Sequence, residues 1–316
     1  MVSPLSAAAY IVLLVLATVI FADGVEKVAV RLGLTRFATG ALLTAALTAL
    51  PETMIAILSR IQGGLSYLEV GAGSILGAPS ITILVGAPIV VLAHHRRPVN
   101  AGVSRNYLLF AAIFLPSILA LLLLPELFFR YALAFGLMIL YVQLARGIYR
   151  EEGELMESGS RTVLERVLRA NSIALMLIQV SSSLALMIYA ADSFMEEVVA
   201  SVDPLAYSLL LSPLGTCLEE VLVAAYWSLR RKADVALSLL SGENLIQSTF
   251  VLGAGIFATG MYLPPNTTTI VALIYTTAAL ALAAILRAGA RPTTVLPITL
   301  LYALYMALAL YMKPIY

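Results

Sequence analysis

Charged residues and cysteine are both scarce in this sequence. Asp, Glu, Lys and Arg together make up 12% of the 316 residues, while 61% are hydrophobic and the mean hydropathy is +0.98. Soluble globular domains carry about 25% charged residues, so this composition excludes an ordinary soluble domain. A single cysteine excludes an intrachain disulfide, and a net charge of +1 indicates no nucleic-acid role.

The sequence also holds little that could form a catalytic centre. It contains two histidines, one cysteine and no His-Glu-x-x-His motif, which is the helical zinc site of metalloproteases. An intramembrane enzyme is therefore the least supported function, and we expect the chain not to be an enzyme.

Long apolar runs, in contrast, recur along the whole chain. Each is long enough to cross about 30 Å of hydrocarbon as a helix. We expect an all-α membrane protein with ten transmembrane helices, at 4–22, 36–59, 69–93, 106–124, 128–149, 170–191, 204–229, 234–260, 267–287 and 293–312. The one long polar segment, 150–169, is expected to be a linker between a first five-helix repeat, 1–149, and a second, 170–316.

A short phrase containing a carboxylate occurs in the second expected span of each half. The two copies read Leu47-Thr48-Ala49-Leu50-Pro51-Glu52 and Leu214-Gly215-Thr216-Cys217-Leu218-Glu219-Glu220. A charged side chain at the centre of a membrane helix costs about 2.5–3.5 kcal/mol on insertion scales, and such residues mark functional sites. Because each half has an odd number of spans, the two copies enter the membrane from opposite sides. The sequence therefore predicts inverted repeats with an ion site at their interface.

The positions of the basic residues agree with this topology. The connections after the first, third, fifth, seventh and ninth spans, with the adjoining helix ends, hold every Lys and Arg except Arg60, Arg130 and Lys313. By the positive-inside rule these connections, including 150–169, are cytoplasmic. We expect a multi-pass cell-membrane protein with both termini outside.

The repeated phrases supply oxygen ligands for a cation. Pro51 has no N–H, so it removes a hydrogen bond from the Leu47 carbonyl one turn before Glu52. Other residues expected to open the third, seventh and eighth spans are Gly71, Gly73, Gly77, Pro79, Pro213, Gly215 and Gly242. Broken backbone at membrane depth is tolerated where it is buried in protein or lines a cavity. Freed carbonyls, threonine hydroxyls and two carboxylates together suit Ca²⁺ and can also take Na⁺.

These residues resemble the α-repeats of the calcium/cation antiporter superfamily, which includes the sodium/calcium exchangers. In that pattern Thr, a small residue, Leu, Pro and Glu are followed by a charged hairpin and a Gly-Asn-x-x-Gly-Ser-Asn-x-x-Asn run opening the next helix. The corresponding runs here are 71–82 in the first half and 238–247 in the second. The resemblance covers essentially the whole chain.

The resemblance implies a set of metal-site residues, which are Glu52, Glu220, Thr48, Thr216, Glu243, Gln247 and Thr82. Glu52 and Glu220 would be the paired divalent ligands, and Glu243 a further ligand or a proton-linked group. The threonines and Gln247 would supply neutral oxygens. The alignment of the two halves does not fix which residue of the first half corresponds to Gln247; Ala78, Ser80 and Thr82 all stay possible.

The chain departs from the family pattern at several of these positions. Glu219 takes the place of the proline in the second copy, and Ala49 and Cys217 take the place of the usual serine. Glu243 stands where the family has Ser, and Gln247 stands where it has Asn. The site is therefore expected to hold fewer hydroxyl and amide ligands and more carboxylates than a typical sodium/calcium exchanger.

The function that we expect is a secondary antiporter that exchanges Ca²⁺ for a monovalent cation, Na⁺, by alternating access. The alternatives are a Ca²⁺/H⁺ exchanger, a passive cation channel with the same acidic lining, and a relative that binds without transporting. The expected partners are the transported Ca²⁺ with Na⁺ or H⁺, and the lipid bilayer. We expect no cofactor.

Overall fold

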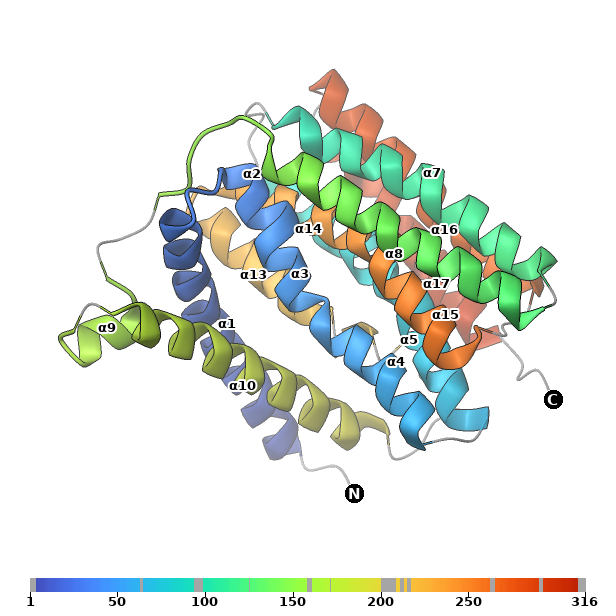
Figure 1. The fold of residues 1–316 in the computed structure, drawn as a ribbon, viewed down its shortest axis with the longest axis horizontal. Helices are drawn as coiled ribbons and strands as arrows, with labels where there is room; N and C mark the ends of the chain where they lie inside the picture. The colour runs from blue at the N-terminus through green and yellow to red at the C-terminus, as the bar shows by residue number, and fades with distance from the viewer. Residues whose placement is uncertain are drawn as a thin grey trace.

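The computed structural model is a bundle of helices (Figure 1). It describes residues 4–62, 65–93, 99–124, 126–157, 161–170, 172–199, 209–210, 213–214, 217–261, 265–289 and 292–311. Its helical elements are α1 (Pro4–Arg31), α2 (Arg36–Ala38), η1 (Thr39–Thr44), α3 (Ala45–Thr48), α4 (Leu50–Gln62), α5 (Leu65–Ile81), η2 (Thr82–Gly86), α6 (Ala87–Ala93), α7 (Ala101–Leu123), α8 (Leu127–Tyr149), α9 (Val163–Val167), α10 (Ile173–Val199), α13 (Leu218–Leu229), α14 (Ala233–Ile246), η3 (Gln247–Val251), α15 (Leu252–Thr259), α16 (Pro265–Ala288), η4 (Pro292–Val295) and α17 (Leu296–Tyr311). The described part of the chain contains no β-strand.

Eight helical stretches of described residues are long and apolar enough to cross a membrane. They are Arg36–Ile61, Val70–Ala93, Ala101–Leu123, Leu127–Tyr149, Ile173–Ala190, Ala233–Thr259, Thr268–Ala288 and Thr293–Leu310. The first expected span, 4–22, falls within the 28-residue helix α1, and much of the seventh, 204–229, lies outside the described residues. The all-helical architecture is confirmed, whereas the count of ten spans and the inverted repeat stay predictions.

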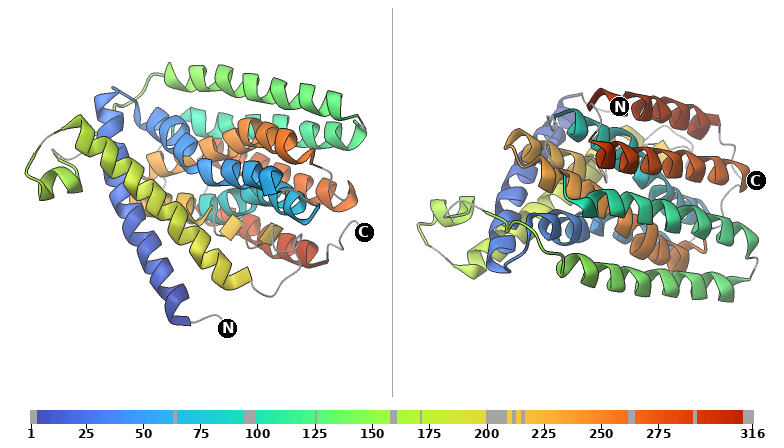
Figure 2. Two further views of the ribbon diagram at one scale, coloured as in Figure 1. Left: turned by 60° about the horizontal axis from the view of Figure 1, so that its bottom comes forward. Right: turned by 90° about the horizontal axis from the view of Figure 1, so that it is seen from above.

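Two long helical stretches form the centre of the bundle. In the most apolar part of Val70–Ala93 and of Ala233–Thr259, 83% and 94% of the residues are buried, against 17% in Leu127–Tyr149. Element α14 packs against η1 and α13, and α5 packs against α4. Helices α1 and α10 pack on each other along one flank of the bundle (Figure 2). These two stretches are therefore shielded by the surrounding helices over most of their length.

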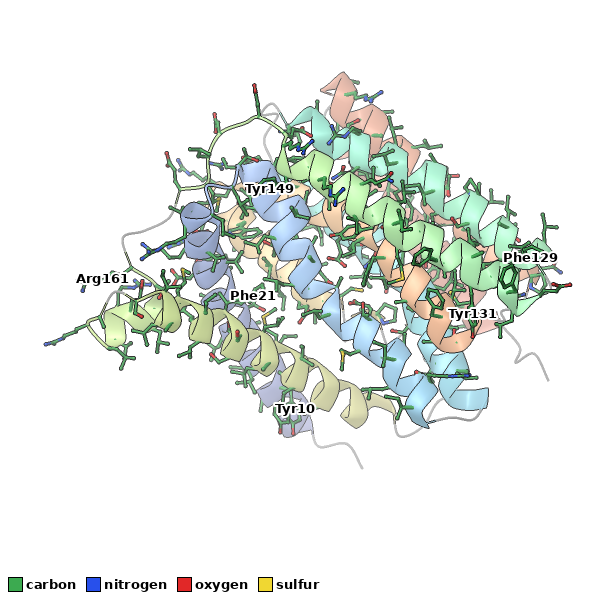
Figure 3. All side chains as sticks on the ribbon, viewed as in Figure 1. Tyr10, Phe21, Phe129, Tyr131, Tyr149 and Arg161 are labelled. Carbon is green, nitrogen blue, oxygen red and sulfur yellow. The ribbon has the colours of Figure 1, made fainter. Side chains whose placement is uncertain are left out.

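Aromatic side chains lie at both ends of the peripheral helix α8. Tyr149 lies at one end and Phe129 and Tyr131 at the other (Figure 3). Phe129 is 48% exposed and Tyr149 is 60% exposed. Tyrosine rings, which are amphipathic, gather at the two membrane–water interfaces, so the positions of Tyr131 and Tyr149 fit a helix that spans the bilayer.

Ion pairs join separate helices near the end of the bundle where basic residues gather. The Arg36 guanidinium donates to the Asp234 carboxylate at 2.5 and 2.6 Å, which ties α2 to α14. Glu26 of α1 accepts a hydrogen bond from Trp227 Nε1 at 2.8 Å and pairs with Lys232 Nζ at 2.6 Å. Two-point pairing of a guanidinium with a carboxylate fixes geometry as well as distance, so the start of α14 is held firmly against α2.

The approach of α14 to η1 depends on glycines. A Cβ atom on Gly242 would overlap the backbone of Ala41, and one on Gly40 would lie 2.5 Å from the Val235 carbonyl oxygen. The two helices therefore touch backbone to backbone. This packing through small residues is typical of helix interfaces in membranes, where close contact replaces the hydrophobic effect.

We expect Gly242→Ala to destabilise the protein, because the added methyl group meets fixed backbone rather than a movable side chain. Overpacking of this kind costs about 1–3 kcal/mol. The matched control is Gly136→Ala in α8, where a Cβ would have nothing within 4 Å; there Ala should be neutral or stabilising by about 0.5–1 kcal/mol. Thermal unfolding in detergent measures both variants, and equal midpoints would contradict the close contact.

Candidate cation site

Two helices begin next to buried carboxylates. Helix α3 ends at Thr48, Ala49 forms a turn, and α4 begins at Leu50, all inside the membrane-spanning stretch Arg36–Ile61. Glu52 thus lies in the first turn of α4. The partial positive charge at a helix N-terminus stabilises an anionic side chain in the first turn. The break expected near Pro51 is therefore present, and it lies just before the proline.

The second half repeats this arrangement at α13. This helix begins at Leu218, directly after Cys217, and carries Glu219 and Glu220 in its first turn. Gly215, one of the residues expected to open this span, lies outside the described residues. Both halves therefore present carboxylates at the N-terminus of a helix, which is the polarity that favours a negative charge.

The third and eighth spans are not broken at their glycines, which corrects the sequence prediction. Helix α5 runs without interruption through Gly71, Gly73, Gly77 and Pro79, and α14 runs through Gly242. The irregularity follows instead as a π-helical segment, which begins at Thr82 in η2 and at Gln247 in η3. A π segment adds one residue to a turn and often occurs at functional sites. Because the two π segments begin at Thr82 and Gln247, these two residues correspond. This favours Thr82 over Ala78 and Ser80 as the counterpart of Gln247.

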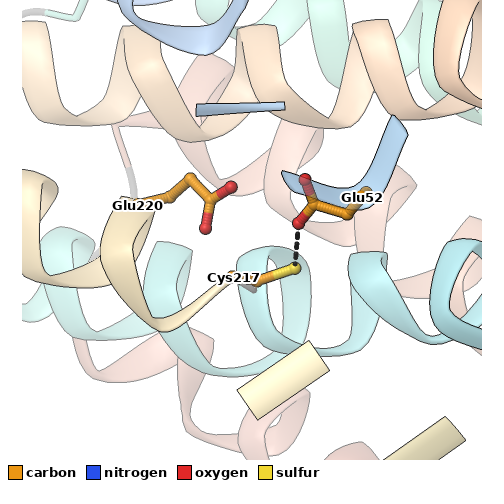
Figure 4. A group of neighbouring side chains, drawn as sticks. All are labelled: Glu52, Cys217 and Glu220. Atoms are coloured by element: carbon orange, nitrogen blue, oxygen red, sulfur yellow. Dashed lines mark hydrogen bonds between the residues drawn. The ribbon is translucent and has the colours of Figure 1, made fainter. Parts of the chain in front are cut away.

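Four glutamates are wholly buried around these irregularities, namely Glu52, Glu219, Glu220 and Glu243, each 0% exposed. Glu52, Cys217 and Glu220 each place one ligand atom within 4.8 Å of those of the other two (Figure 4). Cys217 Sγ donates a hydrogen bond to Glu52 Oε1 at 3.1 Å. The carboxylate oxygens of Glu219 and Glu220 accept no hydrogen bond from another described residue. Since buried charges need partners, a cation would complete this cluster.

A polar network adjoins the cluster and connects the two halves. The Thr48 hydroxyl donates to Glu243 Oε2 at 3.1 Å, and Gln247 Nε2 donates to Glu243 Oε1 at 3.3 Å. The Thr82 hydroxyl donates to Asn244 Oδ1 at 2.9 Å. Gln247 Nε2 also lies 4.0 Å from Cys217 Sγ, which links the network to the carboxylate cluster. These side chains offer further oxygen ligands within one buried region.

The structure brings the expected site residues together wherever it describes them. Thr216 lies outside the described residues; the others belong to the cluster or to the network, and their roles as ligands stay predictions. Cys217, Glu219 and Asn244 were not among the expected site residues. Cys217 and Glu219 could have been identified from their position inside the repeated phrase. Asn244 could have been identified from its position beside Glu243 in the eighth span.

An all-helical membrane fold with paired buried carboxylates at helix N-termini is that of a membrane cation transporter. The family model described as sodium/calcium exchanger protein matches residues 2–146 and 172–312. The chain therefore belongs to the sodium/calcium exchanger protein family, a family of transporters. None of the curated proteins with which the chain was compared matches it.

Solved structures of the sodium-calcium exchanger NCX_Mj are similar to this structure. The one soaked with 10 mM Na⁺ and zero Ca²⁺ is 18% identical, with a TM-score of 0.74 over 97% of this chain and 99% of that chain. The one soaked with 2.5 mM Na⁺ and 10 mM Sr²⁺ is 17% identical, with a TM-score of 0.75 and the same coverage. At this identity the likeness establishes the fold alone; the match to the family model is what confirms the superfamily to which the sequence pointed.

We expect Glu52→Gln and Glu220→Gln each to abolish Ca²⁺ binding. Removing one carboxylate leaves a divalent ion undercompensated in a dry site, and breaking a buried ion pair typically costs about 3–5 kcal/mol, or at least about 100-fold in affinity. Calorimetric titration of the purified protein measures the loss. Glu126→Gln is the control, because Glu126 is exposed at the start of α8. Parent-like binding by either site variant would rule out a shared site.

Proposed function

We propose that this protein is a secondary antiporter that exchanges Ca²⁺ for Na⁺ by alternating access. The observation that carries the proposal is the meeting of Glu52 and Glu220, from corresponding phrases of the two halves, in a wholly buried cluster within 4.8 Å. Two carboxylates balance the charge of one divalent ion, and oxygen ligands suit Ca²⁺. The sodium-calcium exchanger NCX_Mj, whose fold this chain shares, gives independent support.

The surrounding side chains would complete the coordination shell. Thr48, Thr82 and Gln247 would supply neutral oxygens, together with Thr216 from the second copy of the phrase. Glu243 would add a third carboxylate, held in place by its hydrogen bonds from Thr48 and Gln247. Ca²⁺ takes six to eight oxygen ligands in flexible geometry, whereas Na⁺ needs less charge at the same site. One set of groups can therefore serve both ions in turn.

The buried charge explains why such a site would exchange ions rather than leak them. An empty site leaves several carboxylates without counter-ions in an apolar medium, which is a high-energy state. Closing the empty site off from water on both sides, a step that alternating access requires, is therefore disfavoured, and the change that moves the site from one side to the other needs an ion in place. Inverted repeats provide two related conformations with the site at their common interface.

The Ca²⁺/H⁺ exchanger is the second candidate. Glu243 is a carboxylate where the family pattern has Ser, so this site carries more acid groups than a typical sodium/calcium exchanger. A transport measurement with imposed ion gradients distinguishes Na⁺ from H⁺ as the counter-ion.

We expect proteoliposomes loaded with Na⁺ to take up radioactive Ca²⁺ when they are diluted into Na⁺-free buffer at constant pH. Equal Na⁺ on both sides should give background uptake, and so should Glu52→Gln. Uptake driven by a pH gradient alone would assign H⁺ as the counter-ion. Uptake that needs no gradient would indicate a passive channel, and no uptake under any gradient would indicate a relative that does not transport.

A further inference from the structure

The candidate cation site contains a thiol. Cys217 is the single cysteine of the chain, and its side chain is 0% exposed. It occupies the N-cap position of α13, yet it makes no side-chain capping bond to that helix. Its Sγ atom lies instead 3.1 Å from Glu52 Oε1, on the other half of the chain (Figure 4). The thiol therefore faces the cluster rather than the helix that it begins.

A second observation points to a ligand at the same place. Glu220 is also 0% exposed, and neither of its carboxylate oxygens accepts a hydrogen bond from another described residue. Figure 4 shows this carboxylate directed toward Cys217 and Glu52. Two oxygens and one sulfur thus converge within 4.8 Å of one another. Atoms bound to one Zn²⁺ at about 2.0–2.3 Å lie about 3.5 Å apart, so a small inward movement would close the site.

We propose that Cys217 makes this site select thiophilic divalent cations such as Zn²⁺ and Cd²⁺, with Glu52, Cys217 and Glu220 as ligands. The inference rests on the proposed function, in which the two carboxylates hold a transported divalent ion. Ca²⁺ is bound by oxygen and gains little from sulfur, whereas a thiolate is a preferred ligand of softer metals. On binding, a metal–sulfur bond replaces the S–H bond, and one proton is released to water.

The thiol is present in one half only. The corresponding position of the first copy is Ala49, which is apolar and buried. The site therefore gains one sulfur ligand rather than a symmetric pair. A mixed set of one thiolate and two carboxylates keeps the hard ligands that Ca²⁺ needs and adds the soft one that distinguishes Zn²⁺ and Cd²⁺.

The test is Cd²⁺ titration of the purified full-length protein, followed by the ultraviolet thiolate-to-metal charge-transfer band. Because the chain has one cysteine, this band can arise only from Cys217. We expect the band to saturate at one Cd²⁺ per protein and to disappear in Cys217→Ser. That variant should lose at least about tenfold in Cd²⁺ affinity, and its loss of Ca²⁺ affinity should be clearly smaller than its loss of Cd²⁺ affinity. Ala49→Ser is the matched control, and it should keep the band.

The outcomes separate this inference from the proposed function. Ca²⁺ binding by the parent without a Cd²⁺ band, or parent-like Cd²⁺ affinity in Cys217→Ser, overturns the role of the thiol and leaves calcium exchange standing. A Cd²⁺ charge-transfer band in a protein that does not bind Ca²⁺ would support Cys217 as a metal ligand and overturn calcium exchange. Binding of neither ion overturns both. If Cys217→Ser does not fold, the band of the parent and its loss in Glu220→Gln decide the question.

Discussion

The structure depends on accommodating carboxylates in an interior that is otherwise apolar. Glu52, Glu219, Glu220 and Glu243 are all wholly buried, and an uncompensated charge in such a medium costs many kcal/mol. Two kinds of compensation are built into the fold. The first turns of α4 and α13 place three of the acids at positive helix ends, and hydrogen bonds from neighbouring side chains hold the fourth. In the proposed exchanger the remainder would come from the transported cations, so that occupancy and conformational energy would be linked.

The backbone brings the acids together through close helix contact. Gly242 touches the backbone of Ala41, and Glu243 follows directly after it. The absence of a side chain at Gly242 therefore sets how near Glu243 comes to Thr48, which lies one helical segment beyond Ala41. The Thr48 hydroxyl donates a hydrogen bond to Glu243 at 3.1 Å. A packing requirement at one residue thus fixes the geometry of the site at the next. The firm Arg36–Asp234 pair at the end of the same helices holds their relative position.

The sequence predicted the two central acids because a carboxylate inside an apolar run is costly and therefore conspicuous. It did not predict how the third and eighth spans would deviate from regular helix. Glycine and proline signal a weakened helix, but whether the chain breaks or forms a π segment depends on the packing of its neighbours. The preference for Thr82 over Ala78 and Ser80 rests on the start of that segment, which no local pattern reveals. Asn244 had a local signal, because it lies beside Glu243 in the run that matches the family pattern, but its contact with Thr82 joins residues far apart in the chain.

The two halves contribute unequally to the site, although their central acids correspond. Glu52 and Glu220 occupy matching positions, whereas the added acid Glu219 and the thiol of Cys217 correspond to Pro51 and Ala49. The additional charge and the sulfur therefore all come from the second half. In a carrier built from inverted repeats, the two access states exchange the roles of the halves. If this chain is such a carrier, as proposed, its unequal ligands would give the two states different affinities for the same ion, and a difference in affinity is what lets an ion shift the balance between them.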